Sequence, residues 1–305
     1  MFSMKVIIFN VEQGFCAFIN SPSGYSLLID CGSTDRFSPI KYIKDHELGF
    51  SFSYNGHSLT KFILTHPHDD HLTDIQNLIS YLPPGIIRRQ VYDWEEIKDP
   101  GARDKYKNLD NYSSWQQTYR YPETYPNWGM KLIDTIYLVP ECAKSINEAN
   151  FVNNSSIPVI IEYAGVKFTF GADLEKEGWL TLLQRDDFRN AIAGTDFFIT
   201  SHHGHTTGYT KEIFDAMGRP SLNIVSAHRG DDSVDPAYSS EENTVVMNFG
   251  GVTRHMVSTR NGESIIFEVQ SNGYATCELK KLPQNKFVSL SDLLRLGATP
   301  LSPIP

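Results

Sequence analysis

Short apolar runs separated by turn residues fill the first third of the chain and predict paired β-strands. Residues 4–9 (MKVIIF), 16–20 (CAFIN) and 26–30 (SLLID) are rich in branched and aromatic side chains, and glycines and an SPSG turn separate them. A helical stretch is expected over 39–46, and the run 61–64 (KFIL) predicts a further strand.

After that strand the apolar positions take a helical period, which predicts a helix over 73–81. Its apolar face consists of Leu72, Ile75, Leu78, Ile79 and Leu82. Strands at 157–163 and 166–170 are expected to form a hairpin about Ala164 and Gly165. Further helices are expected at 174–186 and 211–217, and further strands at 196–200, 222–225, 256–258 and 264–269, the last two joined at Asn261-Gly262.

The segment from 84 to about 150 differs in composition from its surroundings. Residues 84–137 hold seven tyrosines and three of the four tryptophans, but none of the 18 phenylalanines. Tyr and Trp each carry a polar group, so this composition favours a partly wet contact surface. We interpret 84–150 as an insertion or cap within one domain over 1–285. An irregular surface excursion with ordinary packing is the alternative. A short helix and tail are expected over 286–305.

Strand-rich halves with helices between them favour a layered α/β sandwich. No apolar run approaches the roughly 20 residues of a membrane helix, and the amino terminus is read as a strand rather than a signal peptide. The four cysteines (Cys16, Cys31, Cys142, Cys277) show no paired spacing, which is typical of reduced thiols. We therefore expect a cytoplasmic protein without a membrane partner.

The net charge of the chain bears on whether it binds nucleic acid. The chain carries 27 Lys and Arg against 36 Asp and Glu, a formal charge of −9. Proteins that bind duplex DNA non-specifically are usually basic, because phosphate contacts supply that affinity. The balance therefore disfavours avid non-specific DNA binding, although it is compatible with a local basic groove.

The densest group of potential metal ligands is the sequence HPHDDH, residues 66–71, directly after an apolar strand. Imidazole and carboxylate groups suit zinc and other first-row divalent ions. His66 and His68 can converge on one ion, and Asp70 and His71 can reach a second. A hydrophilic loop with unrelated histidines is the alternative, but three His and two Asp in six positions argue against it.

Later strand ends offer further ligands. Asp173 follows the strand 166–170 and could bridge two ions; its alternative role is the N-cap of the next helix. His202 and His203 follow the strand 196–200, where a buried neutral pair is the alternative. His228 follows another strand and is a weaker candidate for substrate contact.

Five ordered segments resemble the metallo-β-lactamase-fold hydrolases, and within them the branch of ComEC-type competence nuclease domains and phosphorylcholine esterases. They are VEQGF (11–15), LLIDCG (27–32), HPHDDH (66–71), NNSS (153–156), and the pair GAD and SHHG between 171 and 204. The resemblance spans residues 11–205 and continues more weakly at 258–262. It implies a four-layer αββα sandwich and a dinuclear metal site.

On this resemblance, His66 and His68 hold one ion, and Asp70, His71 and one of the His202/His203 pair hold the other, with Asp173 bridging. We favour His203 as the ligand and His202 as the group that stabilises charge or the leaving group. Asp30 resembles the strand-end Asp that orients a ligand histidine.

Two departures from the family pattern bear on substrate choice. No histidine occurs between 72 and 201, so water or substrate is expected to complete the His66/His68 ion, near Asn153 or Asn154. His205 stands where the branch has a serine, and we assign it, with His228, a weak role in substrate binding.

The predicted function is that of a metal-dependent hydrolase, a phosphodiesterase or nuclease in which a metal-bridging hydroxide attacks. The predicted catalytic residues are Asp70, His202, Asn153 and Asn154. Zn²⁺ is the favoured metal, with Mn²⁺ as an alternative. Hydrolysis of a lactone, thioester or amide is the alternative reaction, and a metal-bound module that recognises a protein partner is a third hypothesis. The sequence assigns no protein partner or oligomeric state.

Overall fold

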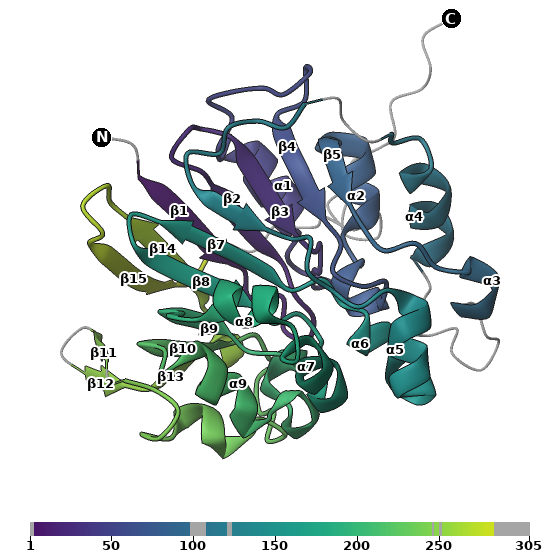
Figure 1. The fold of residues 1–305 in the computed structure, drawn as a ribbon. Helices are drawn as coiled ribbons and strands as arrows, with labels where there is room; N and C mark the ends of the chain where they lie inside the picture. Colours follow the sequence, from purple (N-terminus) through teal and green to yellow (C-terminus); the bar gives the residue numbers. More distant parts are fainter. Residues whose placement is uncertain (1–2, 98–107, 121–123, 246, 250–251, 284–305) are drawn as a thin grey trace, which may run out of the picture.

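The computed structural model describes residues 3–97, 108–120, 124–245, 247–249 and 252–283. Two β-sheets pack face to face, and helices cover their outer faces (Figure 1). The predicted four-layer αββα sandwich is therefore confirmed. The predicted tail at 286–305 lies outside the described residues.

The first sheet has the order β15-β14-β1-β2-β3-β4-β5, in which β3, β4 and β5 run parallel. Its strands are β1 (Met4–Ile8), β2 (Ala17–Asn20), β3 (Ser26–Ile29), β4 (Leu59–Ile63), β5 (Pro84–Arg88), β14 (Ser264–Val269) and β15 (Ala275–Lys280).

The second sheet has the order β13-β10-β9-β8-β7-β6, in which β8, β9, β10 and β13 run parallel. Its strands are β6 (Lys131–Ile133), β7 (Val159–Tyr163), β8 (Val166–Phe170), β9 (Phe197–Ile199), β10 (Leu222–Val225) and β13 (Met256–Ser258). A separate pair consists of β11 (Met247–Phe249) and β12 (Val252–Arg254).

The helices form two outer layers. Those beside the first sheet are α1 (Pro39–Asp45), α2 (Ile75–Tyr81), α3 (Trp94–Ile97) and α4 (Leu109–Gln116). Those beside the second sheet or at the edge between the sheets are α5 (Pro140–Ile146), α6 (Phe151–Asn154), α7 (Lys176–Leu182), α8 (Asp186–Ile192) and α9 (Lys211–Met217).

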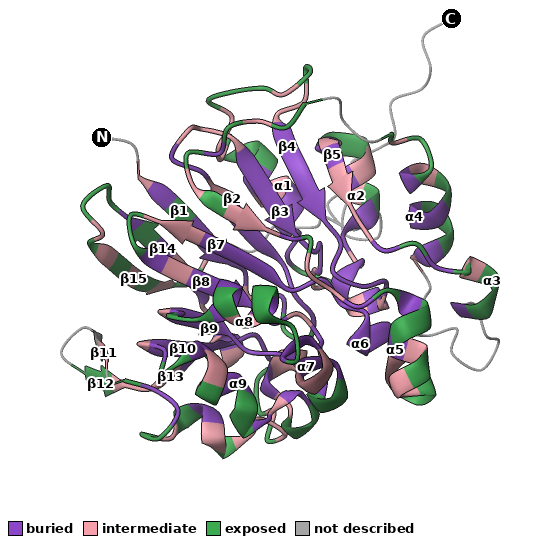
Figure 2. Cartoon of the chain, viewed as in Figure 1, coloured by how far each residue is buried: buried purple, intermediate pink, exposed green. Residues whose placement is uncertain are grey.

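Strand alternation explains the layers. In β1, Val6 and Ile8 point between the sheets, whereas Ile7 points to the helices on the outer face. The central strands β3, β4 and β10 are buried on both faces, which matches their near-continuous apolar runs, whereas the edge strand β15 alternates between exposed and partly buried residues (Figure 2). Three clusters of buried side chains result, one between the sheets and one under each helical layer.

The hairpin between β7 and β8 is confirmed, and its turn residues Ala164 and Gly165 both have positive φ. The helix predicted over 174–186 is present but shorter, because α7 ends at Leu182, and a second helix, α8, begins at Asp186 and was not predicted. Arg185 has extended ψ of 128° as the N-cap of α8, and Asp186 and Asp187 open the new helix, where carboxylates favour its positive end. The last two predicted strands, β13 and β14, are consecutive but lie in different sheets.

The aromatic-rich segment contributes strands to both sheets. It begins with β5 at the edge of the first sheet and includes β6 at the edge of the second. Tyr112 is fully buried under the first sheet, and Trp128 packs between the sheets. Both ends of the proposed insertion are thus joined to the sandwich, while α3 and α4 cover the outer face of the first sheet.

The carboxyl ends of the parallel strands meet at one edge of the sandwich. Asp30 follows β3, residues 64–71 follow β4, Asp173 follows β8, residues 200–205 follow β9, and Ser226 follows β10. Ligands commonly bind at this edge in parallel α/β sheets. In the described part of the chain, no helix has the length and apolar character needed to cross a membrane.

Candidate metal centre

His71 is held by a buried carboxylate. Its Nδ1 lies 2.7 Å from Oδ2 of Asp30. The same oxygen accepts from the hydroxyl of Thr65, and Oδ1 of Asp30 accepts from the Thr65 backbone amide. This pairing places the imidazole proton on Nδ1 and turns Nε2 toward Asp173, whose Oδ1 lies 3.4 Å away. Nε2 of His71 is buried and has no hydrogen-bond partner.

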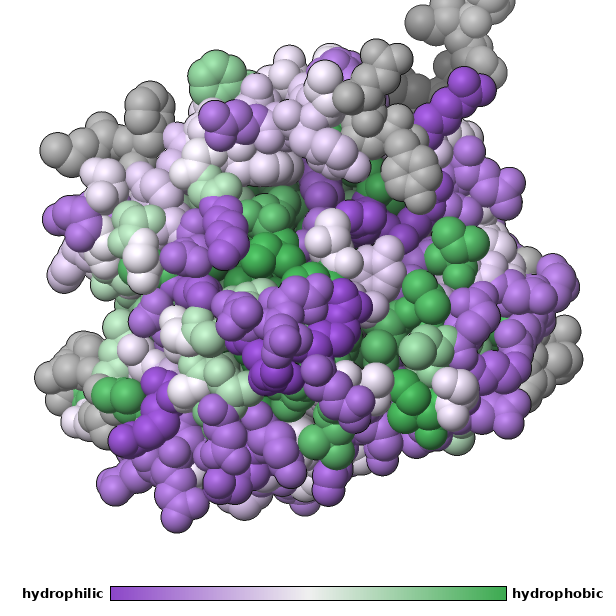
Figure 3. All heavy atoms as spheres, in the orientation of Figure 1, coloured by the Kyte–Doolittle hydropathy of each residue, from purple (hydrophilic) through white to green (hydrophobic). Residues whose placement is uncertain are grey.

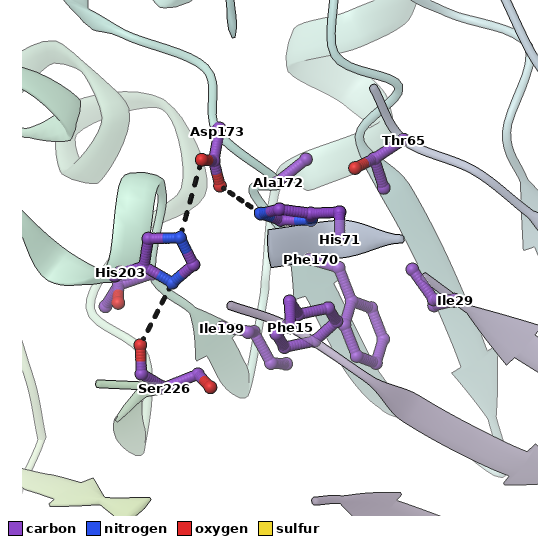
Figure 4. A pocket seen from close by; sticks show the side chains of 11 residues that line it. Phe15, Ile29, Thr65, His71, Phe170, Ala172, Asp173, Ile199, His203 and Ser226 are labelled. Atoms are coloured by element: carbon purple, nitrogen blue, oxygen red, sulfur yellow. Dashed lines mark hydrogen bonds and ion pairs between the residues drawn. The ribbon is translucent and has the colours of Figure 1, made fainter. Parts of the chain in front are cut away.

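His203 is oriented in the same manner from the second sheet. Its Nδ1 lies 3.1 Å from the backbone oxygen of Ser226, at the end of β10. Its Nε2 lies 3.3 Å from Oδ2 of Asp70 and 3.5 Å from Oδ2 of Asp173, without a hydrogen-bond partner. Figure 4 shows His71 and His203 facing Asp173 from opposite sides, with an apolar wall behind them.

His66 and His68 form the other half of the centre. The hydroxyl of Thr65 lies 3.1 Å from Nδ1 of His66, and Nε2 of His66 lies 3.6 Å from Oδ2 of Asp173. Nδ1 of His68 lies 3.1 Å from Nε2 of His66. Two groups of potential ligands therefore meet: His66, His68 and Asp173 form one, and Asp70, His71 and His203 the other.

This donor set fits two divalent cations. The potential ligand atoms of each group lie within 4.8 Å of one another, and Asp173 contacts histidines of both groups. Buried imidazole nitrogens without partners are costly, and a bound cation would satisfy them. The alternative role of Asp173 as a helix N-cap is not observed, because the N-cap of α7 is Glu175.

The electrostatics of the centre balance carboxylates against imidazoles. Burial lowers the pKa of His66 well below its usual value. Burial also opposes the charging of His71 and His203, but Asp173 and neighbouring carboxylates raise both pKa values, that of His203 to about 10. In turn these imidazoles hold the pKa of Asp173 well below its usual range, despite its burial. Without metal, protons on His71 and His203 therefore offset the carboxylates.

Strained backbone is concentrated here. Asp30, Ala172, His202 and His203 all have positive φ, between 48° and 55°. Non-glycine residues rarely adopt this conformation, and such strain persists where surrounding structure enforces it, often at functional sites.

Two glycines allow the loop that carries Asp70 to pack closely. A Cβ on Gly14 would lie 2.2 Å from the backbone oxygen of Asp70, and one on Gly32 would lie 2.6 Å from the same atom. Gly14 also has φ of +108°, which favours glycine. The VEQGF and LLIDCG segments therefore support the metal-ligand loop by contact.

Around the centre, Glu175 organises a set of polar side chains. Its carboxylate accepts hydrogen bonds from Asn150 (2.6 Å) and Asn153 (3.0 Å), and Nδ1 of His202 lies 3.5 Å from its Oε1. Nδ1 of His202 also lies 2.7 Å from the hydroxyl of Thr207. Sequence reasoning did not select Glu175, although a carboxylate two residues after Asp173 was a visible signal.

The two predicted asparagines have different surroundings. Asn153 borders the open cavity and has a buried, unpartnered Oδ1. Asn154 is not among the residues that line the cavity, and its Oδ1 accepts from the backbone amides of Glu175 and Gly178. Asn154 thus satisfies amides at the start of α7.

His205 and His228 lie outside the metal groups. The Nδ1 of His205 accepts from the backbone amide of Thr207 at 3.2 Å, and its ring neighbours that of His202. The side chain of His228 is 48% exposed and lies 3.6 Å from Asp231. Neither residue borders the cavity described next.

The centre opens into a polar cavity of about 520 Å³. Neutral and acidic side chains and histidines border it, and no lysine or arginine is among its described lining residues. The lining consists of Gln13, His68, Asp69, Asp70, Thr73, Asn150, Asn153, Asp173, Glu175, His202 and His203. Asp69, inside the HPHDDH motif, accepts two hydrogen bonds from Asn108 and so fixes the loop from outside.

Comparison with known proteins gives one family-model match and several similar solved structures. A family model, the metallo-beta-lactamase superfamily, matches residues 9–140. Among solved structures, the metallo-beta-lactamase fold protein YhfI from Bacillus subtilis is 16% identical and has a TM-score of 0.42, with 90% of this chain and 100% of that chain covered. Igni18, described as a novel metallo hydrolase from Ignicoccus hospitalis, is 12% identical with a TM-score of 0.45 and coverage of 88% and 100%.

Zn²⁺-bound PqqB from Methylobacterium extorquens is 12% identical, with a TM-score of 0.34 and coverage of 65% of this chain and 72% of that chain. No curated protein matches the sequence. The matched segment 9–140 includes the HPHDDH loop and Asp30. Asp173 and His203, the other potential ligands described above, lie outside this segment.

Proposed function

We propose that this metallo-β-lactamase-fold protein is a dinuclear metal-dependent hydrolase that cleaves phosphodiester bonds, in nucleic acid or in a small molecule. The observation that carries the proposal is the convergence of three Nε2 atoms, from His66, His71 and His203, on the single carboxylate of Asp173. Histidine-rich mixed ligation of this kind favours Zn²⁺, with Mn²⁺ as the alternative.

In this proposal His66 and His68 hold one cation, Asp70, His71 and His203 hold the other, and Asp173 contacts both. When bound, two such cations activate water near neutral pH and stabilise the attacking and leaving oxygens of an in-line displacement. Asp30 and the backbone of Ser226 keep the imidazoles in the tautomer that presents Nε2.

The residues around the cations bind and orient the substrate. His202 borders the cavity, and its Nδ1 lies 2.7 Å from the hydroxyl of Thr207. In this proposal that hydroxyl donates to Nδ1, so the proton lies on Nε2, which would donate to the leaving oxygen. Burial lowers the pKa of His202, which keeps this imidazole neutral at pH 7. Asn153 donates to Glu175 and, like His68, lines the cavity.

Two observations support a phosphodiester over other bonds. The cavity is lined by polar groups rather than by the apolar side chains that would hold an acyl chain. The ordered motifs resemble those of ComEC-type nuclease domains and phosphorylcholine esterases, both of which act on phosphodiesters. The fold alone does not choose the bond.

A substrate panel tests the proposal. Zinc- or manganese-loaded protein is assayed on bis-p-nitrophenyl phosphate, single-stranded DNA, RNA, cyclic nucleotides, a lactone and nitrocefin. We expect turnover of phosphodiesters and its loss in Asp70→Ala, with the exposed Asp215→Asn as a charge-matched control. Hydrolysis of the lactone or nitrocefin alone, or phosphodiester turnover that survives His68→Ala/Asp173→Ala, would contradict the proposal.

A further inference from the structure

A second cleft, outside the catalytic cavity, gathers arginines in an otherwise acidic protein. It has a volume of about 270 Å³ and lies between the end of β5, the chain after α4, and the start of α5. Arg88, Arg89 and Arg120 line it together with Tyr119 and Tyr137. The chain as a whole carries a formal charge of −9, so three guanidinium groups around one cleft form a local exception.

Among the residues that the structure describes, few acidic groups neutralise this positive charge. Arg88 lies 3.6 Å from Asp134, which also pairs with Lys61. Arg89 donates only a long hydrogen bond, 3.5 Å, to the backbone oxygen of Tyr119. Among the described residues, neither Arg89 nor Arg120 takes part in an ion pair. Glu141 also lines the cleft, which leaves an excess of positive charge.

Two tyrosines in the lining of the cleft could stack on a flat aromatic ring of a ligand. Tyr119 and Tyr137 border the cleft, and aromatic side chains of this kind stack on nucleobases. Val91 and Val139 also line it, although they are 73% and 49% exposed. The guanidinium groups of the arginines can form paired hydrogen bonds to a phosphate, and the tyrosine rings can stack on a flat aromatic group. The cleft therefore suits a ligand that carries both.

The cleft lies at the same edge of the sandwich as the metal centre. The backbone oxygen of Arg88 accepts from Leu64 at 3.0 Å, two residues before His66. Neighbouring strands are about 4.8 Å apart, so the cleft and the centre are separated by about one strand and a short loop. Gln90 lines this cleft, and its side-chain amide donates to the backbone oxygen of Ser155 at 2.7 Å. In Figure 3, hydrophilic side chains gather in a hollow over β4 and β5.

We propose that this arginine–tyrosine cleft binds a nucleoside phosphate. The inference rests on the proposed function in one respect, because the nucleotide would be the part of the substrate that lies beyond the scissile bond. The catalytic cavity has no lysine or arginine among its described lining residues, so this cleft supplies fixed positive charge near it. A free nucleotide has the same chemistry and is the other source that the test distinguishes.

Calorimetric titration with AMP, a monoester that a phosphodiesterase does not cleave, tests the site directly. The variants are Arg89→Gln/Arg120→Gln and, as a control with the same change in charge, the exposed pair Lys5→Gln/Lys280→Gln. Loss of each charged hydrogen bond weakens binding by about tenfold or more. We therefore expect at least a tenfold weaker affinity for AMP in the arginine variant, and less than a twofold change in the control.

Asp173→Asn separates this cleft from the metal centre, because it is expected to keep AMP binding. Adenosine and ribose 5-phosphate measure the contributions of the ring and the phosphate. Equal AMP affinity in the wild-type protein and the arginine variant, or AMP binding lost only in Asp173→Asn, would overturn the proposal. Circular dichroism and thermal melting show whether each variant is folded.

Competition then identifies the source of the nucleotide. If the cleft holds the distal part of the substrate, AMP raises KM for an oligonucleotide but not for bis-p-nitrophenyl phosphate. If AMP binds through the arginines and changes neither KM, the ligand is a free nucleotide. A wild-type protein that binds AMP through the arginines but cleaves no phosphodiester would refute the proposed function and leave the cleft supported.

Discussion

Nδ1 of His71 lies 2.7 Å from Oδ2 of Asp30, and the two side chains are 1% and 0% exposed. A carboxylate at the end of β3 therefore orients an imidazole that belongs to a loop after β4, with Nε2 directed at Asp173. His203 is oriented in a similar way, because its Nδ1 lies 3.1 Å from the backbone oxygen of Ser226. Hydrogen bonds to Nδ1 thus orient both imidazoles of the candidate metal centre, with Nε2 available to a cation.

Asp30→Asn tests this relationship. The amide can present an N–H to Nδ1 of His71, which moves the imidazole proton to Nε2 and blocks that atom as a ligand. Because such outer partners contribute substantially to metal binding, we expect the affinity of the zinc ion held by Asp70, His71 and His203 to fall about 10- to 100-fold. Competition titration with a chromogenic chelator measures it, with Asp215→Asn as control. Unchanged affinity would show that Asp30 only supports the fold.

Proton release on metal loading tests the electrostatics. Burial alone lowers the pKa of His203, but Asp173 and Asp70 raise it from 6.5 to about 10 in the metal-free protein. At pH 7.5 a cation must therefore displace protons, and apparent zinc affinity rises with pH. Calorimetry in buffers of different ionisation enthalpy counts the protons released. Loading without proton release at pH 7.5 would be inconsistent with this charge balance.

The same shift predicts how stability depends on pH without metal. A folded-state pKa raised from 6.5 to about 10 means that His203 contributes its full stabilisation below about pH 6.5. That contribution is lost as pH rises through about 10.

Gly14→Ala tests the contact between the first loop and Asp70. Gly14 and Gly165 both have positive φ, but only at Gly14 would a Cβ clash, at 2.2 Å from the backbone oxygen of Asp70. Backbone strain alone costs roughly 1–2 kcal/mol in each variant. We expect Gly165→Ala to lose only this amount of the free energy of unfolding. Gly14→Ala should lose more, and it should also bind less zinc. Urea unfolding and metal analysis measure both; equal effects at the two sites would refute the contact.

A buried ion pair links the two sheets, since Lys61 in β4 contacts Asp134 just after β6 with 4% and 6% side-chain exposure. Burial lowers the pKa of Lys61, and Asp134 opposes this effect. Removing one partner leaves an uncompensated charge, so Asp134→Leu should lower the free energy of unfolding by about 3–5 kcal/mol. The double variant Lys61→Met/Asp134→Leu should recover most of that loss.

Lys131→Met supplies the control, because Lys131 and Glu162 form an exposed pair at 4.0 Å. Exposed pairs contribute about 0–1 kcal/mol. Denaturant titration distinguishes the two cases, and a double variant no better than Asp134→Leu would argue against a paired interaction.

Local patterns predicted the strands that form most of both sheets and a layered α/β sandwich, because apolar runs bounded by turn residues are local signals. The four-layer arrangement was implied only by the resemblance of the ordered motifs to a known family. The short edge strands β5 and β6 were not predicted, since β5 begins with Pro84 and Gly85 and gains its pairing from β4. The break between α7 and α8 was also missed, because both helices share one apolar face against the second sheet.

Within the candidate site, the ligand-type residues were visible as His and Asp at strand ends. Their roles remain predictions, but the structure places Asp173 and His203 beside the HPHDDH loop. Glu175 was missed although it lies two residues after Asp173, because its contact with His202 leaves no local pattern. Ser226 could not be selected, because it holds His203 through a backbone oxygen that any residue carries. Asn154 was assigned to the cavity, yet it supports α7.

The central claim is that two cations share Asp173, and metal stoichiometry tests it most directly. Elemental analysis of protein loaded with zinc and freed of excess metal should give two ions per chain, falling below two in Asp173→Asn while Asp215→Asn retains both. A chain that binds no zinc, or that keeps its full complement without the Asp173 carboxylate, would contradict the account.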